Sequence, residues 1–299
     1  MTALASRPPE KAAPRRGSWH VVEPFFAGLL AAAAVAAIYR VFVGTTLGQV
    51  VDTAAMRGAA VHHTKVVAVL NRTLNGTTLA SLVLVCLVAA AIGVIRKRLD
   101  LAVGAAVMVV AANGSAQLLK TRLDRPDLDD FPAPNSFPSG HTTAAASVAF
   151  AMILVLPYAV RGMVTLIGAG YVAIIAVATV WAEWHRPSDA VAGLLIVLAW
   201  GGLIAAVLRA RRYRIRGPLA RVNRLAKVPL LIGGGITAVV VLLGLAAVAA
   251  VERGWVDFGL GPGRIAFVTG SAGIAAAVAG TFLIWVRLAA GDQPSSDAL

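Results

Sequence analysis

The sequence predicts an all-α fold, a polytopic bundle of membrane helices. Hydrophobic residues make up 59% of the 299 residues and charged residues only 14%, unlike the average soluble domain. Apolar windows of about 20 residues, enough to cross a hydrocarbon core of about 30 Å, recur along the chain. Backbone groups in lipid must pair within their own segment, so we expect these windows to be helices.

Eight such windows follow one another, at 22–43, 77–95, 100–119, 142–160, 163–182, 189–208, 228–250 and 264–286. The first follows a basic, proline-containing segment and lacks a clear small-residue cleavage site, so we expect a retained span rather than a signal peptide. Short polar or charged connections separate the others and are too short for a separate soluble domain. The single cysteine, Cys86, lies in an apolar run and is interpreted as a small core residue.

Lys and Arg predict the orientation. The run RARRYRIRGPLARVNRLAK, residues 209–227, is the strongest positive-inside signal. It favours a plasma (inner) membrane protein with both termini cytoplasmic, and a lipid-headgroup or regulatory site is the alternative role of this loop. Orientation therefore explains the net charge of +13, and no nucleic-acid partner is expected.

Three outward connections then carry the polar residues of interest: 44–76, 120–141 and 183–188. The first is long enough for an amphipathic helix on the outer surface, within QVVDTAAMRGAAVHHTKVVAVL. His62 and His63 in this stretch are adjacent and lack acidic or cysteine neighbours at metal-ligand spacing, so we interpret them as surface residues.

The tetrapeptide PSGH, residues 138–141, stands directly before the fourth window. A helix N-terminus offers unpaired N–H groups and the positive end of the dipole, which favours an anion. Gly140 allows close approach of a ligand to the backbone, and Ser139 offers a hydroxyl. The alternative is that Pro138 and Ser139 only start and cap the helix.

Two further motifs face the same side. Lys120 ends the third window and Arg125 follows in LLKTRLDRP, placing cations outside against the orientation rule; simple snorkelling is the alternative. In WHRPSDAVAG, His185 and Asp189 are four residues apart, a spacing that brings side chains together on a helical turn. Asp189 could then orient the imidazole for nucleophilic attack, or only cap a helix that Pro187 starts.

Taken together, Lys120 with Arg125-Pro126, PSGH, and His185 with Asp189 resemble the three motifs of the type 2 phosphatidic acid phosphatase superfamily. This superfamily includes membrane lipid phosphate phosphatases and soluble vanadium haloperoxidases. The resemblance implies a six-helix core. We expect a basic cytoplasmic tail at 1–20, the six-helix core at 21–208 and a basic cytoplasmic loop at 209–227. Two extra membrane helices at 228–287 and a cytoplasmic tail at 288–299 would follow.

The chain departs from the family pattern twice. Four residues instead of the usual six separate Lys120 from Arg125, and Asp127 takes the usual arginine position. The usual Ser-Arg pair before the histidine of the third motif is replaced by Ala178 and Thr179. The candidates to supply the missing phosphate-binding charge are Arg186, next to His185, and Arg122 in the first loop.

By resemblance, the protein is a lipid phosphate phosphatase with its site at the outer face. Its substrate would be phosphatidate, phosphatidylglycerophosphate or a polyprenyl (di)phosphate carrier of the cell envelope. His185, oriented by Asp189, would form a phosphohistidine, and His141 would protonate the leaving oxygen. The residues predicted to bind phosphate are Lys120, Arg125, Ser139, Gly140 and Arg186.

No metal or cofactor is implied, and the acidic residues Asp124, Asp127, Asp129 and Asp130 are interpreted as a surface cluster. Partners are the lipid phosphate and membrane lipids, and the sequence does not indicate an oligomeric state. The alternatives are a lipid phosphotransferase, an inactive family member, and a non-catalytic anion-binding or transport protein. Polar residues inside the third window, Asn113, Ser115 and Gln117, suggest the transporter.

Overall fold

The computed structural model describes residues 19–59, 79–212, 224–255 and 261–290. All regular elements in these ranges are helices: α1 (Trp19–Ile38), continued by the π-helical turn η1 (Tyr39–Val43), α2 (Thr46–Arg57), α4 (Leu79–Ile95), α5 (Leu99–Arg122), α6 (Gly140–Val155), α7 (Tyr158–Trp181), α8 (Pro187–Arg212), α9 (Arg224–Glu252) and α10 (Pro262–Ala290). The predicted fold class is confirmed.

Each of the eight apolar windows corresponds to one helix. Among the described residues, six helices are long and apolar enough to span a membrane, whereas the apolar parts of α4 and α6, Val83–Ile95 and Gly140–Val155, are shorter. The predicted border between the fourth and fifth windows was wrong. Pro157 cannot continue a helix, so α6 ends at Val155 and α7 begins at Tyr158.

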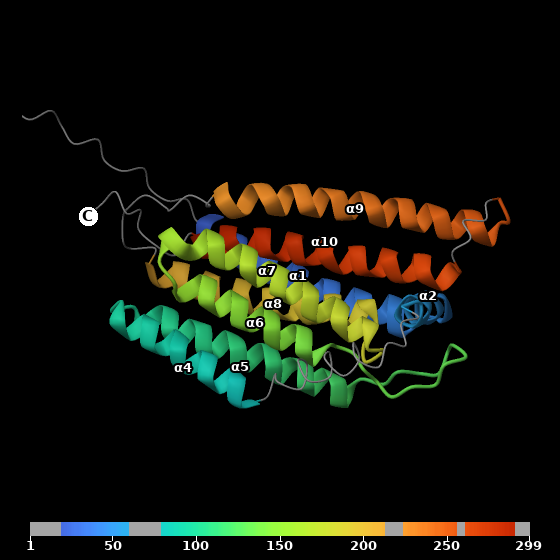
Figure 1. Ribbon diagram of the computed structural model, residues 1–299. Coiled ribbons are helices and arrows are strands. Elements are labelled where there is room, and N and C mark those ends of the chain that lie inside the picture. Colours follow the sequence, from blue (N-terminus) through green and yellow to red (C-terminus); the bar gives the residue numbers. More distant parts are fainter. Residues whose placement is uncertain (1–18, 60–78, 213–223, 256–260, 291–299) are drawn as a thin grey trace, which may run out of the picture.

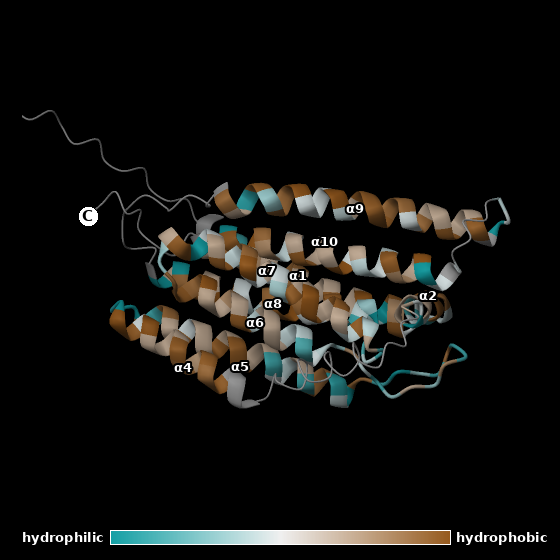
Figure 2. Ribbon diagram, in the orientation of Figure 1, coloured by the Kyte–Doolittle hydropathy of each residue, from teal (hydrophilic) through white to brown (hydrophobic). Residues whose placement is uncertain are grey.

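The long helices lie side by side (Figure 1), and α8 packs against α1, α5, α6 and α10. Apolar residues cover much of the helix surfaces, while hydrophilic residues gather towards the ends of the bundle (Figure 2). One end carries both α2 and the extended segment that joins α5 to α6. The polar residues of the predicted site lie at this end.

Small residues allow α1 and α8 to approach each other closely. A Cβ atom on Gly28 would lie 2.8 Å from the carbonyl oxygen of Ala199, and one on Gly202 would lie 2.5 Å from that of Pro24. In lipid, helix association depends on such close packing because apolar surface gains little by leaving lipid tails. The crossing therefore fixes α1 against the helix that carries Asp189.

The C-terminal pair is packed onto this core. Trp285 of α10 stacks on Phe150 of α6 with ring centroids 4.9 Å apart, and its indole N–H donates to the Phe150 carbonyl at 3.1 Å. Arg161 of α7 donates to the Ala289 carbonyl at 3.1 Å. Helix α9 packs mainly on α10, where Gly244 leaves room for Thr269.

Helix α2 begins the predicted amphipathic stretch of the first outward connection, but its buried face is partly polar. Gln49, Asp52 and Thr53 are buried, whereas Leu47 and Val50 are exposed. The polar residues turn inward because partners on other segments satisfy them, as described below. His62 and His63 lie outside the described residues.

We predict that Gly202→Val destabilises the protein, because the added side chain meets backbone atoms of α1 that cannot move aside. Overpacking of this kind costs about 1–3 kcal/mol. The measurement is the melting temperature in detergent. Gly170→Val on α7 is the matched control, since no residue that the structure describes lies within 4 Å of a Cβ atom there. Equal melting temperatures for the two variants would contradict the proposed crossing.

Candidate active site

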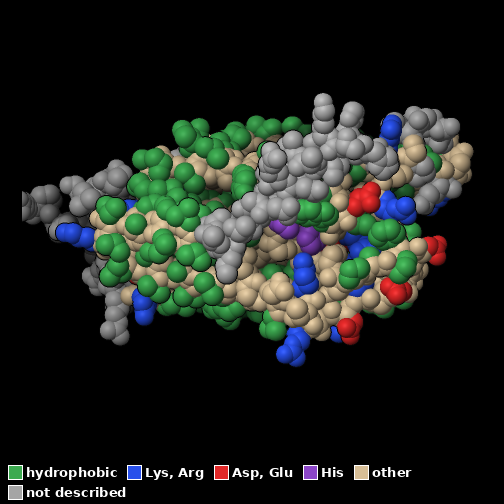
Figure 3. Space-filling view, turned by 60° about the horizontal axis from the view of Figure 1, so that its bottom comes forward, with side chains coloured by type: hydrophobic (Ala, Val, Ile, Leu, Met, Phe, Trp, Pro, Cys, Tyr) green, Lys and Arg blue, Asp and Glu red, His purple; other side chains and the backbone are tan. Residues whose placement is uncertain are grey.

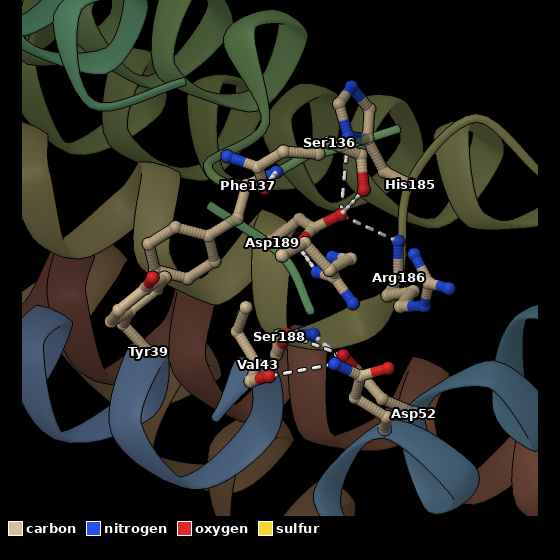
Figure 4. Close-up of polar contacts among 12 residues, drawn as sticks. Tyr39, Val43, Asp52, Ser136, Phe137, His185, Arg186, Ser188 and Asp189 are labelled. Atoms are coloured by element: carbon tan, nitrogen blue, oxygen red, sulfur yellow. Dashed lines mark hydrogen bonds and ion pairs between the residues drawn. The ribbon is translucent and has the colours of Figure 1, made fainter. Parts of the chain in front are cut away.

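Asp189, in the first turn of α8, is the centre of the polar cluster. Its carboxylate is fully buried and accepts hydrogen bonds from Arg125 Nη2 at 3.1 Å, Ser136 Oγ at 2.6 Å and the Arg186 backbone N–H at 3.0 Å. His185 Nδ1 lies 3.5 Å from the same carboxylate, which is long for a hydrogen bond. Figure 4 shows these groups converging on Asp189.

The way in which α8 begins explains the position of Asp189. Pro187 occupies the first helical position, where its missing N–H costs nothing. Asp189, two residues later, accepts the N–H of the preceding cap residue Arg186, as in a capping box. The capping interpretation and the functional interpretation of Asp189 are therefore compatible, because separate lone pairs serve the cap and the side chains.

His185 precedes α8, so the expectation that it shares a helical turn with Asp189 was wrong. A tight turn after α7 presents it instead: Glu183 adopts the left-handed region with φ of 57°. The backbone N–H groups of Trp184 and His185 both donate to the Thr179 carbonyl, at 3.0 and 3.2 Å. This turn directs His185 Nδ1 towards Asp189 and leaves Nε2 on the opposite side of the ring.

The two predicted histidines lie together. The ring centroids of His141 and His185 are 6.2 Å apart at an interplanar angle of 64°, and Trp184 lies 5.5 Å from His141. In the space-filling view of Figure 3, histidine side chains are visible from outside, with Lys or Arg side chains nearby.

The N-terminus of α6 is built by the PSGH motif. Ser139 is fully buried, and its hydroxyl accepts from the Thr142 N–H at 3.4 Å as the helix cap. Its own N–H donates to the Asp189 carbonyl at 2.9 Å, which ties the starts of α6 and α8 together. Among the described residues, none lies within 4 Å of a Cβ atom built on Gly140. The Ser139 hydroxyl therefore serves the cap, whereas no described side chain occupies the space in front of Gly140.

Arg186 and Arg125 bring two guanidinium groups into the buried part of the site. Arg186 Nε donates to Thr53 Oγ1 of α2 at 2.9 Å. Arg125 Nε, Arg125 Nη1 and Arg186 Nη2 are buried and have no hydrogen-bond partner among the described residues. Burial, followed by the like charge of Arg125, lowers the pKa of Arg186. Unsatisfied buried donors are costly, and an anion would satisfy them.

Lys120 lies in the last turn of α5, half-buried and close enough to Asp189 to interact with its charge. Asn135 caps this helix end by donating to the carbonyls of Lys120 and Leu123, at 3.3 and 2.7 Å. The side-chain amide thus fixes the exit of the chain towards Arg125.

The acidic cluster is not uniformly on the surface. Asp124, Asp127 and Asp130 are exposed, but the Asp129 side chain is largely buried and accepts from Thr53 Oγ1 at 2.6 Å. Its carboxylate lies 4.0 Å from Arg186 Nη2. The surface interpretation was therefore wrong for Asp129, which belongs to the surroundings of the site.

The polar residues inside α5 join helices. Asn113 donates to Ser147 Oγ of α6 at 3.0 Å, and Trp200 of α8 donates to Ser115 Oγ at 3.0 Å. Interhelical hydrogen bonds of this kind hold membrane bundles together. Gln117, by contrast, is exposed. The polar residues that suggested a transporter therefore have structural partners at two of the three positions.

The sequence did not predict that α2, Ser136 and Ser188 contribute hydrogen bonds to the polar cluster of the site. Asp52 is buried and accepts the Ser188 backbone N–H at 3.1 Å and also its hydroxyl. The only sequence signal was an acidic residue within an otherwise apolar helical stretch. Hydropathy cannot reveal that such a residue has a distant partner.

Comparison with known proteins agrees with this geometry. Residues 101–213 match the PAP2 superfamily, and this range contains α5 to α8 with all three motifs. The match over these residues agrees with the resemblance that the motifs indicated. No curated protein and no solved structure matches the chain significantly. The family match indicates phosphatase or phosphotransferase activity on phosphate esters, in a protein whose helices indicate several membrane crossings.

The environment of Asp52 predicts a pH dependence of stability. Burial, with the nearby charge of Asp189, raises the pKa of Asp52 from 3.8 to about 7, against the Ser188 hydrogen bonds and the charge of Arg125. Arg186 also faces this carboxyl group. At a pH between 3.8 and about 7, Asp52 of the folded protein holds a proton that the unfolded chain has released. The free energy of unfolding therefore falls as the pH rises through this range.

We therefore expect the melting temperature to decrease between about pH 4 and about pH 7. Asp52→Asn keeps an acceptor for the Ser188 N–H and a donor for its hydroxyl but cannot titrate. This variant should show a shallower decrease over the same range. A decrease as steep as in the wild type would show that other groups are responsible.

Proposed function

We propose that this protein is a metal-independent lipid phosphate phosphatase whose active site lies at the outer face of the plasma membrane. It hydrolyses the phosphomonoester or diphosphate of a lipid such as phosphatidate, phosphatidylglycerophosphate or a polyprenyl carrier. The observation that carries this proposal is the pair His141 and His185, with ring centroids 6.2 Å apart and Asp189 behind one of them.

In the proposed reaction, Nε2 of His185 attacks phosphorus while the bond from phosphorus to the lipid oxygen breaks. His141, in its imidazolium form, gives its proton to the leaving oxygen. Water then attacks the phosphohistidine, and inorganic phosphate leaves. Asp189 supports the first step because its charge holds Nδ1 protonated and stabilises the imidazolium that forms.

Phosphate binding is assigned to the positive groups around the histidines. The unpartnered N–H groups of Arg125 and Arg186 are fixed donors for phosphoryl oxygens, and Lys120 adds a charge. The start of α6, at Gly140, adds its backbone N–H groups. A helix dipole contributes at most about 2 kcal/mol, whereas enzymes lower barriers by about 8–23 kcal/mol. Several cations and a covalent step are therefore needed together.

A neighbouring cavity supports a lipid as the substrate. A space of about 340 Å³ lies between α1, α5 and α8, lined by residues including Leu119, Leu123, Phe137 and Trp200. Phe137 adjoins Ser136, which donates to Asp189. The volume falls in the range of ligand pockets, about 300–1,000 Å³, and the lining suits an apolar chain. A soluble phosphate ester would gain nothing from it.

We predict that purified wild-type protein releases phosphate from a lipid phosphate in detergent without added metal, and that vanadate inhibits the release. His185→Ala should lower the rate by more than about 10³-fold because the nucleophile is lost. His63→Ala, outside the three motifs, serves as the control and should retain activity. The assay measures released phosphate over a panel of glycerolipid and polyprenyl substrates.

Labelled substrate separates hydrolysis from transfer. Label recovered as inorganic phosphate supports the phosphatase, whereas label on a second lipid or sugar supports the phosphotransferase. Both require an acid-labile phosphohistidine that disappears in His185→Ala. A folded wild-type protein that releases no phosphate from any member of the panel would overturn the proposal.

A further inference from the structure

Helices α2 and α10 lie outside the residues that match the PAP2 superfamily, yet both contact the residues directly after His185. Helix α2 contacts Arg186 and Ser188 through polar side chains, and α10 packs closely against Pro187. The motifs assign no role to either helix. Their contacts with residues 186–188 suggest a role in holding the start of α8.

Two successive residues of α2 hold the residues on both sides of Pro187. Asp52 accepts the backbone N–H of Ser188 at 3.1 Å and also binds its hydroxyl. Thr53 accepts from Arg186 Nε at 2.9 Å. All of these side chains are buried, so the hydrogen bonds are shielded from competing water. The first turn of α8 is thus attached to α2 immediately after His185 (Figure 4).

The same face of α2 holds the loop that carries Arg125. Gln49 donates to the Pro126 carbonyl at 2.7 Å and accepts from the Leu128 N–H at 3.4 Å. Thr53 also donates to Asp129 Oδ2 at 2.6 Å. One turn of α2 therefore fixes the first-motif loop relative to the third motif.

Helix α10 packs against α2 and fixes its position. A Cβ atom on Gly270 would lie 2.9 Å from Pro187 Cγ and 3.2 Å from Ala55 Cβ, so α10 touches α8 and α2 at one point. A Cβ atom on Gly58, at the end of α2, would lie 1.7 Å from the carbonyl oxygen of Gly263. Neither contact leaves room for a side chain. The position of α2 thus depends on α10.

We propose that α2 and α10 form a brace that positions His185 and Arg186, with Thr53 and Gly270 as positioning residues. Helix α10 sets the place of α2 and of Pro187, and α2 holds the residues that flank Pro187. Helix α10, which follows the matched residues in the chain, thereby supports the site through Pro187 and α2. The catalytic consequence of the brace rests on the proposed function, but the geometric claim does not.

The first test compares variants of Thr53. Thr53→Val keeps the shape but removes the hydroxyl that joins Arg186 to Asp129, and Thr53→Ser restores it. Hydrogen–deuterium exchange should become faster at residues 183–190 in Thr53→Val and return to the wild-type rate in Thr53→Ser. Exchange at these residues that is unchanged in Thr53→Val would overturn the role of Thr53.

The second test uses α10. Gly270→Val places a side chain against Pro187 and Ala55. Gly280→Val adds the same side chain to the same helix at a position where a Cβ atom has no described residue within 4 Å. Faster exchange at 183–190 is expected for Gly270→Val only. Equal exchange in the two variants would overturn the brace. This measurement decides the matter even if the wild type releases no phosphate.

If the wild type is an active phosphatase, the brace also predicts kinetic effects. A displacement of about 1 Å at a reacting group can cost about 10²-fold in rate. We therefore expect kcat to fall by about this factor in Thr53→Val and Gly270→Val, with recovery in Thr53→Ser and no comparable loss in Gly280→Val. Unchanged kcat in both Thr53→Val and Gly270→Val would overturn the catalytic consequence of the brace.

Discussion

The buried carboxylate of Asp189 is the interaction on which the site depends. A charge at this depth is tolerated only with partners, and its partners come from three separate segments. Arg125 and Ser136 belong to the connection between α5 and α6, and the Arg186 N–H belongs to the start of α8. The third segment is the turn after α7, which places His185 Nδ1 3.5 Å from the same group. Satisfying one carboxylate therefore gathers these segments.

The helix ends add a second constraint. Helices α6 and α8 begin close together, linked by the Ser139 N–H and the Asp189 carbonyl. Each N-terminus carries a partial positive charge. The start of α8 meets the Asp189 carboxylate, whereas no described residue lies within 4 Å of a Cβ atom at Gly140, at the start of α6. This asymmetry leaves one positive helix end available for an incoming anion beside the two histidines.

In this membrane protein, apolar helices form the scaffold and polar residues at the helix ends form the site. Long apolar helices supply rigidity, and close contacts such as Gly28 with Gly202 set their spacing. Polar groups gather towards the ends of the bundle, and at the end that carries α2 many of them bind one another. Helix α2 illustrates the division, since its polar face is turned into the protein while Leu47 is exposed. The buried guanidinium groups are the exception, and their unpartnered donors are the strongest indication of an anionic substrate.

The sequence by itself determined the helical membrane fold, the order of the eight apolar windows and the three motifs, because hydropathy and spacing are local properties of a chain. It also placed His141, His185 and Asp189 at one end of the bundle. The tertiary structure alone decided that His185 precedes the helix, that Ser139 caps α6 and that Asp129 is buried near Arg186. It also decided the roles of α2 and α10, since Thr53 and Arg186 are 133 residues apart. Contacts over such separations depend on how helices pack, and no periodicity or composition of either segment specifies its partner.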